Sequence, residues 1–350
     1  MKIGNKSIGG HNPCFIIAEL SANHNGDLDI AIKTIRAAKR TGADAIKLQT
    51  YTPDTLTINC DNEHFKIGGG TLWDGKTLYE LYGEAYTPWE WHEQLFKVAE
   101  EEGLICFSSP FDHSAVDFLE DLNVPAYKIA SFEIQDIPLI EYAASKGKPI
   151  IISTGIAEEK DIQLAVDTCR KTGNNEIMLL KCTSSYPAPL ELANLNTIPD
   201  LKNKFNVEVG FSDHTYGSLA PAIATTLGAK VIEKHFILDK SVGGPDADFS
   251  LDEKEFTEMV KAVRDTEKML GKINYQLSEK VKKNKKFARS LFVVKDVKKG
   301  EKITPENVRS IRPGYGMHPK YYSTIINKTF STEIKKGEPL DVDMIRGFDL

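Results

Sequence analysis

Two lysines occur inside short apolar runs of the kind that form buried strands, Lys47 in AIKLQT and Lys128 in AYKIAS. Side chains alternate between the two faces of a strand, so Lys47 shares one face with Gln49, while Ile46 and Leu48 share the other. Burying an ammonium group is costly unless an anion meets it. The pattern therefore predicts two inward lysines that bind an anionic substrate. The alternatives are pairing with a carboxylate of the protein itself and a side chain that reaches out at the strand end.

Hydroxyl side chains gather at the carboxyl ends of the same kind of apolar run. They are Ser108, Ser109, Ser131, Ser153, Thr154, Ser184 and Ser212. Each of them alone is ordinary at a strand-to-loop junction. Together with two inward lysines, however, they can donate hydrogen bonds to phosphate and carboxylate oxygens. The combination predicts a site for an anionic substrate that carries both groups.

Two histidines end neighbouring apolar runs, His214 in FSDHT and His235 in EKHF. Taken singly, each is more often a hydrogen-bonded structural histidine. On adjacent strand ends, two imidazoles can bind one divalent cation, and nitrogen ligands supplemented by oxygen suit Mn²⁺, and Mg²⁺ less well. Two histidines make an incomplete site, so substrate oxygens and water must complete it. Glu19, which ends the first apolar run, is placed either to ligate this metal or to act on the substrate.

Polar residues in two turns are weaker candidates. Asp246 and Asp248 lie in GGPDADFS, where aspartate beside glycine and proline forms turns as readily as it binds a ligand. Arg312 lies in RPGYG, and composition alone makes it a solvated surface residue.

Eight apolar runs of strand length recur along the chain, separated by segments of helical periodicity. They are FIIAEL (15–20), AIKLQT (45–50), ICFSSP (105–110), AYKIAS (126–131), PIIIST (149–154), EIMLLKC (176–182), VEVGFS (207–212) and VIEKHF (231–236). Eight strand–helix units predict an α/β fold, a (β/α)8 TIM barrel, whose active site lies at the carboxyl ends of the strands. An open doubly wound sheet is the alternative, but no glycine-rich dinucleotide fingerprint follows any strand.

One connection is far longer than a usual βα loop. Residues 51–87 separate the second strand from its helix, and their aromatic content is not that of a disordered segment. We expect an ordered wall or lid near the site.

The composition shifts after the last predicted barrel helix. A basic, polar stretch follows, and then two related segments with strand periodicity, SLFVVKDVKKGEKIT and FSTEIKKGEPLD, read as hairpin-like units. We expect a TIM-barrel catalytic domain at 1–272, a linker at 273–288 and a small β-rich domain at 289–350, which docks onto something because its own core is marginal.

Charge and composition exclude several classes of partner. The net charge of −6 disfavours a nucleic acid or an anionic membrane, and no stretch approaches 18 consecutive apolar residues. The five cysteines include no C-x-x-C pair and are expected to be reduced thiols. With no apolar signal segment at the N-terminus, we expect a cytoplasmic protein.

Ordered motifs along nearly the whole chain resemble the sialic acid synthase family. They are AELSANHNG (18–26), KLQTY (47–51), FSSPFD (107–112), YKIASFE (127–133), STG (153–155), GFSDHT (210–215), EKHF (233–236), GGPD (243–246) and IRPG (311–314). The resemblance implies a C-terminal antifreeze-like (SAF) domain after the barrel. Segments 75–92 and 127–134 resemble the branch of the family whose sugar is a diacetamido-trideoxy-altrose.

The resemblance also implies a reaction. The methylene carbon of phosphoenolpyruvate attacks the aldehyde of an open-chain acetamido sugar, water adds to the resulting cation, and phosphate leaves by C–O cleavage. A divalent metal, Mn²⁺ or Mg²⁺, polarises the aldehyde as a Lewis acid.

Roles in the family transfer to matching positions of this chain. Glu19 and His235 match catalytic residues, and His214 with His235 matches the metal ligands. Residues that hold phosphoenolpyruvate match Lys47, Ser109, Lys128, Ser131, Ser153, Ser184, Ser212 and Lys285. Residues near the sugar match Gln49, Tyr186, Asp246 and Arg312, and Arg312 reaches the barrel of a second subunit in a domain-swapped homodimer.

Two positions depart from the family's pattern or leave its alignment open. The family commonly has Asn where this chain has Ser184, and the phosphate-binding lysine of the linker aligns with either Lys285 or Lys286. A sialic or legionaminic acid synthase is the nearest alternative function. A non-catalytic sugar-binding or antifreeze-like protein is another, and a Schiff-base aldolase using Lys47 or Lys128 is a third.

Overall fold

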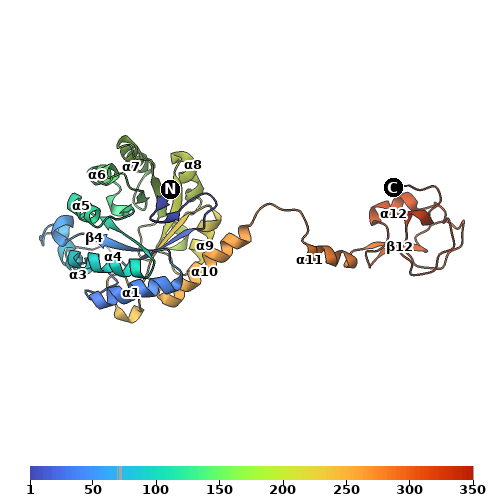
Figure 1. Ribbon diagram of the computed structural model, residues 1–350, viewed down its shortest axis with the longest axis horizontal. Coiled ribbons are helices and arrows are strands. Elements are labelled where there is room, and N and C mark those ends of the chain that lie inside the picture. Colours follow the sequence, from blue (N-terminus) through green and yellow to red (C-terminus); the bar gives the residue numbers. More distant parts are fainter. Residues whose placement is uncertain (69, 71–72, 350) are drawn as a thin grey trace. The chain divides into compact units, whose positions relative to one another are not determined.

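Eight parallel strands close into a barrel in the computed structural model, which describes residues 1–68, 70 and 73–349 (Figure 1). The TIM barrel predicted from the sequence is thereby confirmed. Neighbours follow chain order, and β10 closes the ring by pairing with β3, from Val231 opposite Phe15 to His235 opposite Glu19. The chain divides into two units, Met1–Gly271 with the barrel and Lys272–Leu350.

The barrel strands and the helices that surround them alternate along the chain. The strands are β3 (Phe15–Glu19), β4 (Ala45–Thr50), β5 (Ile105–Pro110), β6 (Tyr127–Ile129), β7 (Ile150–Ser153), β8 (Ile177–Cys182), β9 (Glu208–Asp213) and β10 (Val231–His235). The helices are α1 (Leu28–Thr41), α4 (His92–Glu101), α5 (His113–Asp121), α6 (Ile137–Ser145), α7 (Glu159–Lys171), α8 (Thr197–Phe205), α9 (Leu219–Thr226) and α10 (Glu253–Leu270). The strand expected to end at Ser131 is shorter than predicted, and Ser131 lies in a 3-10 turn, η3 (Ser131–Glu133).

The two faces of each strand serve different layers. On β4, Ile46 and Leu48 pack in the large hydrophobic cluster between strands and helices, whereas Ala45 packs in a smaller cluster inside the barrel. Lys47 has the same parity as Ala45, so it points inward, as the period-2 pattern predicts. Inside the barrel, apolar residues therefore fill the amino-terminal layers, and polar residues occupy the carboxyl-terminal one.

An N-terminal hairpin that the sequence did not predict covers the amino-terminal end of the barrel. Its strands, β1 (Lys2–Ile3) and β2 (Lys6–Ser7), pair antiparallel. Ile3 and Ile8 are buried in the inner cluster with the first residues of the barrel strands. Strands of two residues are too short to give a periodic signal.

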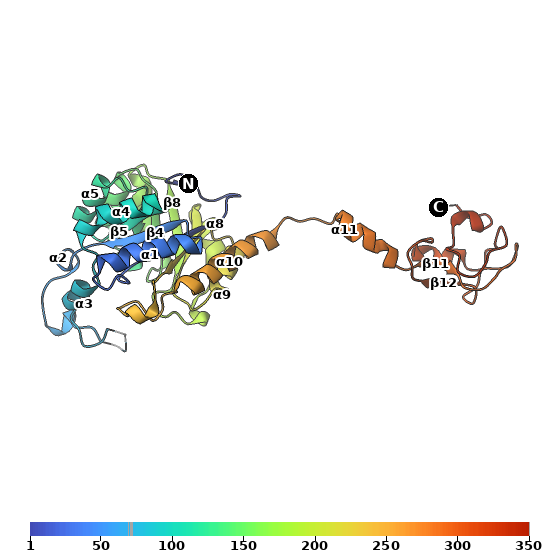
Figure 2. The same cartoon turned by 60° about the horizontal axis from the view of Figure 1, so that its bottom comes forward.

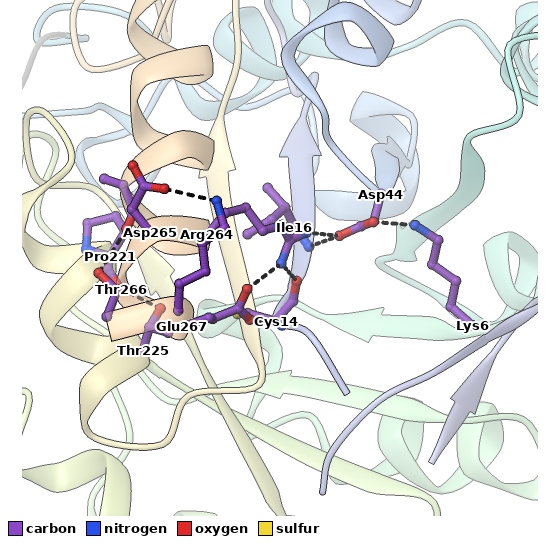
Figure 3. Close-up of polar contacts among 12 residues, drawn as sticks. Lys6, Cys14, Ile16, Asp44, Pro221, Thr225, Arg264, Asp265, Thr266 and Glu267 are labelled. Atoms are coloured by element: carbon purple, nitrogen blue, oxygen red, sulfur yellow. Dashed lines mark hydrogen bonds and ion pairs between the residues drawn. The ribbon is translucent and has the colours of Figure 1, made fainter. Parts of the chain in front are cut away.

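A polar network fixes the last helix of the barrel to the first strand (Figure 3). The Asp44 carboxylate accepts hydrogen bonds from the backbone N–H of Ile16 at 2.8 Å and from Arg264 on α10 at 3.0 Å. Arg264 also donates to the Cys14 carbonyl at 2.6 Å, and Glu267 accepts from the Cys14 N–H. These contacts hold together the two ends of the chain segment that must meet when the barrel closes.

In its described residues, the long connection after β4 is ordered, as predicted. It contains α2 (Pro53–Leu56), η1 (Glu63–Phe65), α3 (Leu78–Ala85) and η2 (Trp89–Trp91), and α2 and α3 project from one side of the barrel in Figure 2. The ring of Tyr51 packs edge-on against Phe111, with ring centroids 5.0 Å apart, and against Tyr82 at 5.8 Å. Residues 69, 71 and 72 of this segment lie outside the described residues.

The second unit has a small core of its own. It begins with residues expected as a linker, which form α11 (Glu279–Lys282) and η6 (Lys283–Phe287), and continues with β11 (Ser290–Val293), β12 (Val308–Ile311) and α12 (Tyr322–Ile325). The two segments expected to be separate hairpins pair with each other instead, through Val297 with Ile334 and Phe292 with Pro339. Both segments have the same strand periodicity, and periodicity does not predict which strand each segment pairs with.

Within residues 1–68, 70 and 73–349, no helix is long and apolar enough to cross a membrane.

Candidate active site

The carboxyl ends of the strands bring the predicted polar residues of the barrel together. Strand register places Glu19 between Lys47 on β4 and His235 on β10. The Lys47 ammonium forms an ion pair with Glu19 and donates to the Ser109 hydroxyl at 3.2 Å. Glu19, Lys47 and Ser109 are all buried. One half of the predicted anion site thus exists as a connected cluster.

The other half is built around a carboxylate that the sequence reasoning missed. Lys128 lies 3.4 Å from Glu233 on β10, and the Ser212 hydroxyl donates to the same Glu233 oxygen at 3.0 Å. Glu233 is two residues before His235, so the period-2 rule that placed the lysines also places it inward. That signal was available in the sequence.

Both inward lysines are therefore paired with barrel carboxylates, which was one of the alternatives open from the sequence. Burial opposes charge on Lys47, but Glu19 and Glu233 raise its pKa above the ordinary value. Burial lowers the pKa of Lys128, against the pull of Glu233. The two pairs leave this part of the site with little net charge.

The two carboxylates differ in protonation. Burial raises the pKa of Glu19 to about 7, and Lys47 opposes this shift only in part. Burial acts on Glu233 as well, but Lys128 and Lys47 outweigh it and lower its pKa. Glu233 is thus a fixed anion, while Glu19 can exchange a proton near neutral pH, which is the usual division between a charge partner and an acid–base group.

Two serine hydroxyls lie against Gly155, just after β7, and a third serine, Ser153, ends β7. Gly155 donates its N–H to the Ser131 hydroxyl at 2.5 Å, and a Cβ at Gly155 would collide with the hydroxyls of Ser131 and Ser184. The Ser153 hydroxyl is buried and has no hydrogen-bond partner among the described residues. A buried hydroxyl without a partner is costly, and a phosphate oxygen would satisfy it.

The two histidines face each other, with ring centroids 5.3 Å apart. Nδ1 of His214 lies 3.0 Å from the Thr183 carbonyl, which can only accept, so Nδ1 carries a hydrogen and Nε2 is the nitrogen that holds the lone pair when the ring is neutral. Nδ1 of His235 is buried without a hydrogen-bond partner in the described structure and lies 3.7 Å from Asp246. Burial keeps the pKa of His235 well below its ordinary value, so its imidazole is neutral.

These nitrogens fit a divalent cation in part. Among the described residues, no group of three or more His, Cys, Asp and Glu side chains is arranged to hold a metal ion. Burial opposes charge on His214, but Cys182 and the Thr183 carbonyl raise its pKa above the ordinary value. The protein offers two imidazoles, one of them with a nitrogen unpartnered among the described residues, and substrate or water would have to supply the other ligands.

Three further predicted residues lie beside Ser21 or the histidine pair: Gln49, Asp246 and Tyr186. Gln49 donates to the Ser21 hydroxyl at 3.0 Å, and this hydroxyl donates to Asp246 at 2.5 Å. The Tyr186 ring packs 4.4 Å from the His214 ring. Trp73 of the long insert donates to the Pro245 carbonyl at 3.2 Å and lies 6.1 Å from the Tyr186 ring, which confirms the predicted wall.

Several candidates lie elsewhere. Ser108 bonds to Thr50 at 2.6 Å on the outer face of the strands, and the Thr154 hydroxyl is engaged by the Leu180 carbonyl. Asp248 is exposed. Lys285 and Arg312 are exposed residues of the second unit, in which the Gly314 N–H next to Arg312 donates to the Lys286 carbonyl at 3.0 Å.

Two more groups near the lysines had no signal in the sequence. Glu133 has a buried carboxylate oxygen without a hydrogen-bond partner among the described residues, and burial raises its pKa to about 7. Cys182, at the end of β8, has its sulfur 3.9 Å from Nδ1 of His214. Neither residue type is diagnostic at a strand end, and only the fold shows that they face the site.

Comparison with known proteins places this site in a family. Residues 34–275 match the NeuB family, and residues 288–346 match the SAF domain. The chain belongs to the NeuB family. The resemblance to sialic acid synthases and the expected SAF domain are therefore confirmed.

Relatives of this NeuB-family chain match it almost from end to end. Pseudaminic acid synthase of Campylobacter jejuni is 53% identical over 97% of this chain and 98% of its own length. Pseudaminic acid synthase of Helicobacter pylori is 50% identical, over 95% and 98%. The crystal structure of N-acetylneuraminic acid (sialic acid) synthetase from Leptospira borgpetersenii, in complex with citrate, has a TM-score of 0.72 and 32% identity, covering 81% of this chain and 94% of that structure. The chain is thus an enzyme, a transferase of this family.

Proposed function

We propose that this enzyme is a pseudaminic acid synthase, which condenses phosphoenolpyruvate with the open-chain aldehyde of 2,4-diacetamido-2,4,6-trideoxy-β-L-altrose to give pseudaminate and phosphate. The observation that carries the proposal is the convergence of Lys47 and Lys128 with buried serine hydroxyls at one end of the barrel. Identity of 53% to a pseudaminic acid synthase, against 32% to a sialic acid synthetase, supports the choice of sugar.

Phosphoenolpyruvate has two anionic groups, and the cluster offers two sets of donors. Lys128, Ser131, Ser153, Ser184 and Ser212 would hold one, and Lys47 with Ser109 the other. The unpartnered Ser153 hydroxyl and the open donors of the lysines supply hydrogen bonds that the protein itself leaves unused. Lys285 of the second unit is the further phosphate ligand in this scheme.

The charge balance supports a divalent metal, Mn²⁺ or Mg²⁺. Lys47 and Lys128 are each paired with a glutamate, so the lysines alone do not balance a multiply charged substrate. His214 through Nε2 and His235 through its unpartnered nitrogen would hold the ion. When bound, it supplies Lewis-acid polarisation of the sugar aldehyde.

The residues of the chain then account for the proton and bond changes. A bond forms between the methylene carbon of phosphoenolpyruvate and the aldehyde carbon, and the aldehyde oxygen takes a proton, which Glu19 can donate because its pKa is near neutral. Water adds to C2 of the resulting cation and loses a proton to the Glu19 carboxylate. The bond between C2 and the phosphate oxygen breaks, phosphate leaves with the proton of the C2 hydroxyl, and a 2-keto acid remains. Glu233 holds Lys128 and Ser212 in position throughout.

The sugar side would be formed by Gln49, Tyr186 and Asp246, and completed by Arg312 of a second copy in a domain-swapped homodimer. Within one copy, Arg312 is exposed in a turn that is fixed by the Ser290 hydroxyl, which donates to the Pro313 carbonyl at 2.6 Å. A fixed turn that presents an exposed guanidinium suits recognition by another chain. Because phosphoenolpyruvate is a metabolite of the cytoplasm, we place the reaction there.

A panel of open-chain acetamido sugars tests the assignment. We expect release of phosphate and formation of a nine-carbon keto acid to be fastest with the diacetamido-trideoxy-altrose. Faster turnover of N-acetylmannosamine or of the legionaminic acid precursor would replace the proposed sugar and retain the reaction. Absence of any phosphoenolpyruvate-dependent product with every sugar of the panel would contradict the proposed reaction. Borohydride reduction of a keto-acid substrate onto Lys47 or Lys128 would instead show a Schiff-base aldolase.

A further inference from the structure

Ser21, in the loop after β3, is the point at which the sugar-side residues of the proposed site meet. Its backbone N–H donates to Glu19 at 3.1 Å, and its hydroxyl accepts from Gln49 at 3.0 Å and donates to Asp246 at 2.5 Å. The side chain is buried, at 3% exposure. One residue that no motif reasoning singled out thus contacts three residues assigned to the sugar side or to catalysis.

The direction of these hydrogen bonds is fixed by chemistry. The Gln49 amide nitrogen can only donate, so the Ser21 hydroxyl accepts a hydrogen bond from it. The single hydrogen of the hydroxyl is then donated to Asp246. The Ala22 N–H is 3.5 Å from the same Asp246 oxygen and makes a poor substitute. The carboxylate orientation of Asp246 toward His235 therefore depends on the Ser21 hydroxyl.

The backbone at Ser21 has a conformation that is unfavourable for serine. Ser21 has φ +47°, in the left-handed region that favours glycine and asparagine. Six non-glycine residues of the described chain have positive φ, and the five others are all asparagine. Glycine would relieve the strain at this position but would remove the hydroxyl. Backbone strain at a residue that contacts site residues points to a functional role for its side chain.

We infer that Ser21 is a positioning residue that sets the Gln49 amide and the Asp246 carboxylate in one fixed relation, and so determines which acetamido sugar the enzyme accepts. This inference rests on the proposed function. Ser21 touches none of the groups assigned to phosphoenolpyruvate other than through Glu19, and that contact uses its backbone. Removing the hydroxyl should therefore affect sugar recognition and leave phosphoenolpyruvate binding intact.

The test compares Ser21→Gly and Ser21→Ala in the full-length enzyme with its metal. Both variants lose the hydroxyl and keep the N–H to Glu19, but only glycine relieves the positive φ. We expect kcat/KM for the preferred sugar to fall at least about tenfold in both, the loss of one well-placed hydrogen bond. KM for phosphoenolpyruvate should change less than about twofold, and the glycine variant should melt at least as high as the wild type. The ratio of kcat/KM between preferred and rival sugars should also shrink.

Thr34→Val is the matched control, because it removes a buried hydroxyl whose one hydrogen bond within the described structure goes to the Ile30 carbonyl of its own helix. Its sugar kinetics should equal those of the wild type. Unchanged sugar kcat/KM in both Ser21 variants would overturn the inference, as would equal losses for sugar and phosphoenolpyruvate, which indicate general damage. If the wild-type enzyme consumed no phosphoenolpyruvate with any of the sugars, the proposed function would be refuted, and the inference about Ser21 would be refuted with it.

Discussion

Glu19 and Glu233 are buried carboxylates of the same site whose pKa values move in opposite directions. Burial raises the pKa of Glu19 to about 7, while the two lysines lower that of Glu233. The site therefore holds one permanent anion and one group that titrates near neutral pH. This division assigns proton transfer to Glu19 and the positioning of Lys128 to Glu233.

Replacing Glu19 by Gln tests the first assignment. Without its proton donor the enzyme should lose about 10²- to 10⁴-fold in kcat, while KM for phosphoenolpyruvate changes little. In the wild type, kcat/KM should fall as pH rises above about 7, because the acid form of Glu19 is then depleted. The steady-state pH profile measures both effects. A profile in which Glu19→Gln retains the alkaline limb would assign that limb to another group.

The proposed metal site depends on two residues, His214 and His235. We expect His214→Ala and His235→Ala to abolish turnover, because each removes one of only two imidazoles that the protein offers the ion. Dialysis against a chelator should have the same effect on the wild type, and Mn²⁺ should restore activity. Full activity in metal-free buffer would show that the two histidines serve another purpose.

At the scale of elements, two buried histidines connect the long insert to the barrel. His24 accepts from the Gly26 N–H through Nδ1 at 3.0 Å and contacts Thr87 through Nε2 at 3.2 Å. His92 meets Thr50 at 2.9 Å and the Pro88 carbonyl at 3.2 Å. Both imidazoles are neutral in the fold, because burial lowers each pKa from 6.5 to about 4.

These shifts predict acid destabilisation. Between pH 6.5 and about 4 the unfolded chain binds protons that the folded chain does not, so stability is complete above pH 6.5 and falls as pH drops toward 4. The loss reaches roughly 3 kcal/mol per histidine at most. Melting curves at several pH values should show a shallower acid slope for His92→Gln than for the wild type. Equal slopes would mean that the pKa of His92 does not differ between the folded and the unfolded chain.

The elements also show which features of the site could be predicted from the sequence. Alternation along AIKLQT and AYKIAS was enough to place Lys47 and Lys128 inside a barrel, because the period of a strand follows from backbone geometry. It could not reveal that Glu233 and Glu19 pair with them, since pairing depends on strand register around the ring. Ser21 was missed for a different reason: its role depends on a left-handed backbone and on a loop more than two hundred residues away.

At the scale of the whole molecule, the proposed site needs more than one chain. The barrel unit holds most of the predicted site residues, whereas Arg312 and Lys285 belong to the SAF-containing unit. We expect Arg312→Ala to lower kcat/KM for the sugar while the barrel stays folded, because in the proposed dimer the guanidinium would contact the sugar, and because Arg312 is an exposed residue of the second unit.

Mixing two impaired variants tests whether Arg312 acts in trans. Arg312→Ala has an intact barrel, and Lys47→Ala has an intact SAF domain. Random reassociation of unfolded and refolded chains should restore about a quarter of the wild-type activity, because half of the dimers are mixed and each has one complete site. No recovery in dimers shown to be mixed would place Arg312 in the site of its own chain or outside any site.

The fate of the bridging oxygen of phosphoenolpyruvate tests the central claim most directly. With ¹⁸O in the bond between C2 and phosphorus, Mn²⁺ and the diacetamido-trideoxy-altrose, we predict that inorganic phosphate carries the label and that one pseudaminate forms per phosphate. Label that remains in the organic product, or phosphate released without a nine-carbon keto acid, would contradict the proposed condensation by C–O cleavage.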